Sequence, residues 1–174
     1  AALEPGFAGV VANPFGTAEA FSRARIAHDF EYWCRVCATV TLKGLGREGP
    51  LALNAPQRRL AAELERQRLA RQPIRVVLLK ARQWGGSTLV QMYMAWMQLV
   101  VRTHWNSVIC GHLRGTSAAI KGMYTRLLRR YPHALLPGGV RPAFKRFEGC
   151  GSAHVVAGRD CLVVTGSAVS QEAI

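Results

Sequence analysis

The feature that most constrains the fold is a strand-like run that leads directly into a glycine loop and then a helical pattern. Residues 74–79 read Ile-Arg-Val-Val-Leu-Leu, a short apolar and β-branched run that favours a buried strand. A loop follows at 80–86, and apolar residues from 87 to about 102 recur at helical spacing. This order predicts an α/β domain with residues 74–79 as its central strand.

The loop between these two elements has several residues of a phosphate-binding site. In the pattern GxxxxGK[ST], backbone N–H groups at a helix start cradle phosphate and a hydroxyl binds magnesium. Gly85 and Ser87 occupy the second glycine and the hydroxyl position, but Lys80 replaces the first glycine and Gly86 replaces the lysine. The cation would therefore come from Lys80 or Arg82. The alternative is a strand-to-helix turn that uses its glycines only for tight geometry.

The rest of the chain alternates helical and strand patterns. Residues 1–16 lack an apolar period and predict an irregular lead-in, which leaves 17–174 as one domain. Helices are expected after Thr17, from Asn54 to about Arg71 with Gln57 completing a capping box, and after Thr116. Further strands are expected at 107–110 and 161–165, with a hairpin formed by 143–147 and 153–156. The element order predicts a largely parallel sheet flanked by helices.

The charge of the chain favours a polyanionic partner. Its 174 residues include 23 Lys and Arg against 10 Asp and Glu, a formal net charge of +13. Such an excess attracts nucleic acid and releases its counterions on binding, although solvated arginine faces are the plainer explanation. The candidate basic helix face consists of Lys121, Arg126, Arg129 and Arg130.

The cysteines and the apolar runs exclude several other classes. Five cysteines, an odd number, and the lack of a recognisable signal peptide favour a reduced, intracellular protein. Cys34 and Cys37 have the spacing of a zinc or redox pair, but no second pair exists, so we expect them in the core. The longest apolar run, 89–101, is shorter than the roughly 20 residues of a membrane span.

One segment resembles a known family. Residues 80–88, Lys-Ala-Arg-Gln-Trp-Gly-Gly-Ser-Thr, look like the deviant Walker A loop of phage terminase large subunits, the ATPases that package viral DNA. The similarity extends to 53–60, 107–112 and 166–174, and so covers most of the chain from about residue 28. It implies a P-loop NTPase-like α/β fold, incomplete at the C-terminus, in the cytoplasm of a bacterial host cell.

The resemblance also implies roles for individual residues. Lys80 would contact the terminal phosphates of ATP, Arg82 would act catalytically by stabilising them, and Ser87 would ligate Mg²⁺. Gln57 would recognise adenine, although completing the capping box with Asn54 is the simpler role. The other residues expected to hold the nucleotide are Gln83, Gly85, Gly86 and Thr88.

The resemblance stops before the acidic half of the ATPase site. Family members continue into a Walker B strand and a nuclease domain, whereas here no apolar run ends in an acidic pair. The chain alone is therefore expected to hydrolyse ATP poorly or not at all. The implied partners are double-stranded DNA, a terminase small subunit, a portal and a ring of identical copies. The alternatives are another P-loop ATPase such as a helicase, whose loop would normally keep Gly-Lys-Ser or Gly-Lys-Thr, and a noncatalytic basic nucleic-acid-binding module.

Overall fold

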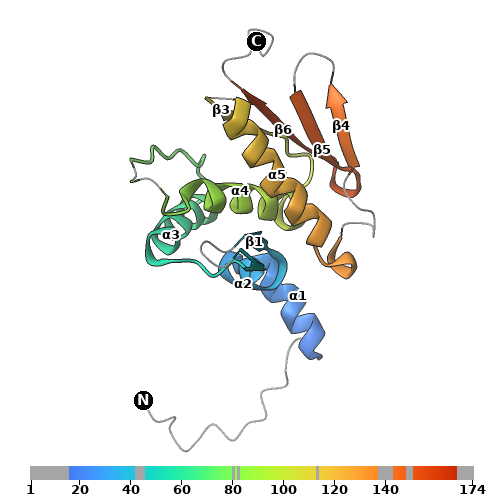
Figure 1. Ribbon diagram of the computed structural model, residues 1–174. Coiled ribbons are helices and arrows are strands. Elements are labelled where there is room, and N and C mark those ends of the chain that lie inside the picture. The colour runs from blue at the N-terminus through green and yellow to red at the C-terminus, as the bar shows by residue number, and fades with distance from the viewer. Residues whose placement is uncertain are drawn as a thin grey trace, which may run out of the picture.

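A computed structural model of the chain describes residues 16–41, 46–79, 81, 83–112, 114–136, 143–147 and 151–167. These residues form a mixed α/β arrangement, with helices in the middle and a sheet at one end (Figure 1). The α-helices are α1 (Ala18–His28), α2 (Phe30–Cys37), α3 (Ala55–Leu69), α4 (Gly86–Trp96) and α5 (Arg114–Arg130). Short helical segments are η1 (Met97–Val101), η2 (His133–Leu135) and η4 (Ala157–Arg159).

The larger sheet is mixed rather than largely parallel. Its strands are β3 (Ser107–Gly111), β4 (Ala143–Phe147), β5 (Gly151–Val156) and β6 (Cys161–Ser167), in the order β3-β6-β5-β4. β3 pairs with β6 in parallel, whereas β5 runs antiparallel to both β4 and β6. The strands predicted at 107–110 and 161–165 and the predicted hairpin are therefore confirmed. A second sheet pairs β1 (Thr39–Thr41) with β2 (Glu48–Pro50).

The prediction of a central strand at residues 74–79 was wrong. The segment belongs to neither sheet, and Val77 and Leu79 are fully exposed. A hydrogen bond to α3 explains part of this placement, because the backbone N–H of Arg75 donates to the side-chain oxygen of Gln67 at 2.9 Å. After the segment, the carbonyl of Trp84 accepts from Asn54 at the start of α3. The start of the segment is thus tied to α3, while Leu78 lines a cavity together with Ile109 and Cys110 of β3.

Helix boundaries follow the capping residues. The Thr17 hydroxyl accepts from the backbone N–H of Ala20, which confirms the predicted start of α1. The helical pattern that continues beyond it is interrupted at Asp29, which ends α1 and caps α2 by accepting from the N–H of Tyr32. α5 begins at Arg114, two residues before the predicted cap.

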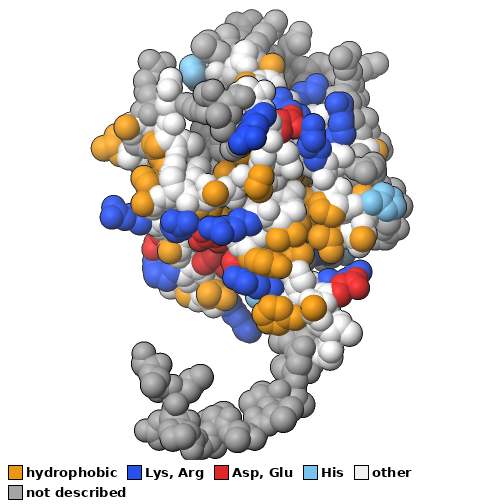
Figure 2. All heavy atoms as spheres, turned by 60° about the horizontal axis from the view of Figure 1, so that its bottom comes forward, with side chains coloured by type: hydrophobic (Ala, Val, Ile, Leu, Met, Phe, Trp, Pro, Cys, Tyr) orange, Lys and Arg blue, Asp and Glu red, His pale blue; other side chains and the backbone are white. Residues whose placement is uncertain are grey.

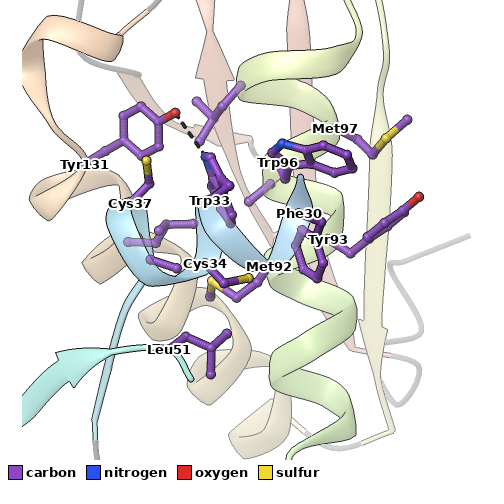
Figure 3. Packing of buried hydrophobic residues seen from close by; sticks show 14 of the residues in the cluster. Phe30, Trp33, Cys34, Cys37, Leu51, Met92, Tyr93, Trp96, Met97 and Tyr131 are labelled. Carbon is purple, nitrogen blue, oxygen red and sulfur yellow. Dashed lines mark hydrogen bonds between the residues drawn. The ribbon is translucent and has the colours of Figure 1, made fainter. Parts of the chain in front are cut away.

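The core lies where α2 crosses α4 (Figure 3). Phe30 contacts the ring of Tyr93 edge-on at 5.1 Å between centroids and lies 5.4 Å from Trp96. Both buried indole N–H groups are satisfied, since Trp96 donates to the carbonyl of Ile26 and Trp33 donates to the hydroxyl of Tyr131. This packing fixes α4, and with it the loop that precedes α4. Within the described part of the chain, no helix has the length and apolar character needed to cross a bilayer.

Candidate phosphate-binding site

The candidate loop enters α4 through left-handed backbone conformations. Gln83 has φ of 68° and Gly85 has φ of 87°, and Gly85 is the N-cap of α4. Within the described residues, no side-chain cap hydrogen bond is made at this N-terminus, because the N-cap residue Gly85 has no side chain. A helix start without a side-chain cap is an arrangement that suits an anion. Lys80 and Arg82, the two predicted cations, lie outside the described residues.

Two side chains from the start of α3 hold the loop in place. The side-chain amide of Asn54 donates to the carbonyl oxygen of Trp84, and that of Gln57 donates to the carbonyl oxygen of Gly85, both at 3.0 Å. The same residues form the predicted capping box, because Asn54 Oδ1 accepts from the N–H of Gln57 and Gln57 Oε1 accepts from the N–H of Asn54. One pair of residues thus caps α3 and positions the loop.

The observed contact with Gln57 favours glycine at position 85. A Cβ built on Gly85 would lie 2.6 Å from the Gln57 side-chain nitrogen, a distance that Cβ atoms essentially never show. The positive φ disfavours other residues independently. Gln57 itself is buried, with 4% of its surface exposed, and both ends of its amide are hydrogen-bonded. The capping role of Gln57 is therefore observed, and adenine recognition stays a prediction.

The next three residues differ in exposure. Gly86 is buried, Ser87 is exposed and Thr88 is partly buried. The hydroxyl of Ser87 is therefore accessible from solvent at the first turn of α4, the position required of a magnesium ligand. Trp84 lines a surface pocket together with Pro56 and Leu60 of α3. Of the predicted nucleotide-binding residues that the structure describes, all lie in the loop, in the first turn of α4 or at the start of α3.

A cavity of about 230 Å³ lies beside the helix start. Ser87 and Gln91 of α4 line it together with Ile109 of β3, and its surface is mostly apolar. Gln91 is 3% exposed and donates to the carbonyl of Ile120 on α5 at 2.6 Å, while its side-chain oxygen has no hydrogen-bond partner among the described residues. We did not single out this glutamine from the sequence. Its position four residues after Ser87, on the same helix face, was the available signal.

The basic face predicted on α5 is partly neutralised. Arg130 forms an ion pair with Glu48 at 2.5 Å. Several other arginines pair with acidic residues of their own helix, as Arg66 does with Glu63 and Arg68 with Glu65. Figure 2 shows one face of the molecule, on which blue basic side chains stand next to red acidic ones in separate groups. On this face the positive charge does not form one continuous patch.

The paired cysteines belong to the core. Cys34 and Cys37 are buried on α2, and both thiols are free (Figure 3). Burial raises the pKa of Cys37 to about 12 and that of Cys34 further still, so both remain protonated near neutral pH. Among the described residues no cluster of three or more His, Cys, Asp or Glu could hold a metal ion.

Comparison with known proteins yields no assignment. No protein-family model matches the chain, and none of the curated proteins compared with it matches either.

Proposed function

We propose that residues 80–88 bind the phosphates of ATP together with Mg²⁺, as the ATP-binding part of a viral DNA-packaging terminase large subunit. The observation that carries this proposal is the uncapped start of α4, which follows a left-handed Gly85 and presents an exposed Ser87 hydroxyl. The anchoring by Asn54 and Gln57 supports it, because a preorganised loop loses less entropy when it binds a ligand.

In this proposal the charged residues of the loop act on the phosphates. Lys80 contacts the terminal phosphates and Arg82 stabilises their developing charge, roles that come from the resemblance of residues 80–88 to the terminase loop. Ser87 ligates Mg²⁺ through its hydroxyl. The proposal also includes a P-loop NTPase-like sheet for the domain. The proposed partners of the protein are double-stranded DNA, a terminase small subunit, a portal and a ring of identical copies, in a bacterial host cell.

One observation favours a second candidate function. Residues 74–79 lie outside the sheet, although a nucleotide-binding loop normally follows a paired strand. A noncatalytic nucleic-acid-binding module with a structural glycine loop would not need that strand. Its net charge of +13 would supply the affinity for a polyanion.

A titration with ATP and Mg²⁺ separates the two functions. Trp84 is the tryptophan of the loop, whereas Trp33 and Trp96 are buried in the core, so a fluorescence change that is lost in Trp84→Phe reports on the loop. The proposal expects saturable binding that Lys80→Ala abolishes. Arg23→Ala is the control, because Arg23 pairs with Glu19 on α1 and lies outside the loop. Equal ATP binding by the two variants would contradict the role proposed for Lys80. Absence of saturable binding to the folded chain would favour the module.

A further inference from the structure

A second pocket lies at the opposite ends of the helices that hold the candidate phosphate loop. The loop is anchored at the start of α3 and leads into α4, whereas this pocket lies where α3 and η1 end. Its volume of about 790 Å³ falls within the roughly 300–1,000 Å³ that is typical of ligand sites. No acidic residue is among the described residues that line it. Its polar and aromatic lining consists mainly of Arg68, Arg71, Arg102, Thr103 and Trp105.

Arg71 lines this pocket from a backbone conformation that usually belongs to glycine. It follows the C-cap of α3 and has φ of 56°. The N–H of Arg71 donates to the carbonyl of Arg68, and the N–H after it, on Gln72, donates to α3 as well, both at 3.0 Å. This is the Schellman arrangement, in which glycine is the common residue just past the helix end. An arginine kept there at a local loss of stability indicates a binding role, because such strain gathers at ligand-binding positions.

The positive charge of the pocket is only partly neutralised. Arg68 pairs with Glu65 at 2.6 Å. For Arg71 and Arg102, by contrast, the described part of the chain provides no ion pair. The end of η1 does not engage the Arg102 guanidinium either, because Arg159 donates to the carbonyl there. Two guanidinium groups that line one pocket without a counter-charge favour an anion, and their paired N–H groups match the oxygens of a phosphate.

Trp105 adds an aromatic surface to the same pocket. It is partly buried, and its carbonyl accepts from the side-chain amide of Gln98 at 3.1 Å. The N–H of His104 donates to the carbonyl of Arg159 at 3.0 Å, which fixes the turn that carries the indole. An aromatic side chain beside phosphate-binding cations is the combination that binds unpaired bases. The bases of a duplex are stacked inside it and are not available for such a contact.

We propose that this pocket binds one nucleotide unit of a single-stranded nucleic acid. Arg71 and Arg102 hold the phosphate, and the base stacks on Trp105. The net charge of +13 favours a strand over a free nucleotide, because a polyanion gains from counterion release along the rest of the basic surface. The inference goes beyond the proposed function, since it adds a second site with a different ligand and does not depend on ATP binding at residues 80–88.

Fluorescence anisotropy of a labelled short oligodeoxythymidine, measured without ATP or Mg²⁺, tests the proposal. Arg71→Ala and Arg102→Ala are each expected to weaken binding about tenfold at low salt. Each should also reduce the slope of log affinity against log salt concentration by about 0.7, the value for one lost phosphate contact on a single strand. Arg126→Ala is the matched control, because it removes the same charge from an exposed position on α5 outside the pocket.

Arg71→Gly separates binding from folding. Glycine relieves the strain at φ of 56°, so this variant is expected to melt about 2–4 °C higher than the wild type and yet to bind as weakly as Arg71→Ala. Trp105→Phe should retain most of the affinity and Trp105→Leu should lose it, because only phenylalanine preserves stacking.

Competition experiments test the nature of the ligand. The unlabelled single strand is expected to displace the labelled one, whereas a duplex of equal length and thymidine monophosphate should compete poorly. Full affinity in Arg71→Gly, or an equal loss in Arg126→Ala, overturns the proposal. So does a wild-type chain that does not bind the oligonucleotide, or a duplex or mononucleotide that competes as well as the single strand.

Discussion

The side chain of Gln57 donates a hydrogen bond to the carbonyl oxygen of Gly85, and this 3.0 Å contact joins the start of α3 to the start of α4. The bond matters because Gln57 also completes the capping box of α3. One glutamine therefore couples the stability of a helix to the position of the loop that precedes the next helix.

Replacing Gln57 with alanine is expected to lower the free energy of unfolding by about 2 kcal/mol, since it removes a helix cap and a buried hydrogen bond. Urea unfolding measures this change. Gln72→Ala is the control, because Gln72 is an exposed glutamine after α3. Similar losses in the two variants would show that neither the cap nor the bond to Gly85 contributes to stability.

Replacing Gly85 with alanine is expected to cost about 1–3 kcal/mol, because alanine must adopt a φ of 87° and its Cβ meets the Gln57 nitrogen. Thermal unfolding measures the cost. Gly115→Ala is the matched control, since Gly115 lies in α5 with open space around it and should gain helix propensity. In the background of Gln57→Ala the cost of Gly85→Ala should shrink. An unchanged cost would mean that the positive φ alone accounts for it.

The third prediction concerns Gln98, a residue with no exposed surface. Its side-chain nitrogen lies within hydrogen-bond distance of Ser107 Oγ and of the carbonyls of Trp105 and Leu162, while its oxygen accepts from the hydroxyl of Tyr124. Gln98→Leu removes all of these hydrogen bonds at a buried position and is expected to destabilise the protein by about 2–4 kcal/mol. Tyr124→Phe should lose less, because it removes one bond and leaves the others. The reverse order of the two losses in urea unfolding would contradict this account.

The fourth prediction is a pH dependence from His154. Burial, with a smaller contribution from Lys121, lowers the pKa of His154 from 6.5 to about 4. The unfolded chain therefore binds a proton below pH 6.5 that the folded chain does not bind until about pH 4. Stability due to neutral His154 is present above pH 6.5 and lost as the pH falls toward 4, by roughly 2–3 kcal/mol. Unfolding of wild type and His154→Gln between these pH values measures the difference, and identical slopes would refute the prediction.

The sequence predicted local structure better than it predicted pairing. The capping box at Asn54 and Gln57, the cap at Thr17 and the β-hairpin could be found because neighbouring residues determine them. Residues 74–79 have a strand-like sequence, but whether they join a sheet depends on distant strands and on the hydrogen bonds to α3. The cap at Gln57 was predicted from the sequence, but its bond to the loop was not, because nothing in the sequence places Gln57 beside Gly85.

The site was predictable to a similar extent. The spacing of Gly85 and Ser87 relative to the helical pattern indicated a helix start with a hydroxyl residue, and both residues lie there. The spacing of Gln91 from Ser87 placed it on the same helix face, but its burial against the carbonyl of Ile120 was not predictable because it depends on how α4 packs on α5. The predicted cations Lys80 and Arg82 lie outside the described residues, so their roles remain predictions.

Calorimetric titration of ATP into the chain, with and without Mg²⁺, tests the central claim most directly. The account predicts saturable binding that weakens when Mg²⁺ is removed or when Ser87→Ala deletes the exposed hydroxyl, with no change in Ser22→Ala, whose hydroxyl contacts Tyr32 on α2. Absence of binding to the folded wild-type chain would contradict the claim. So would binding that is indifferent to Mg²⁺ and to Ser87.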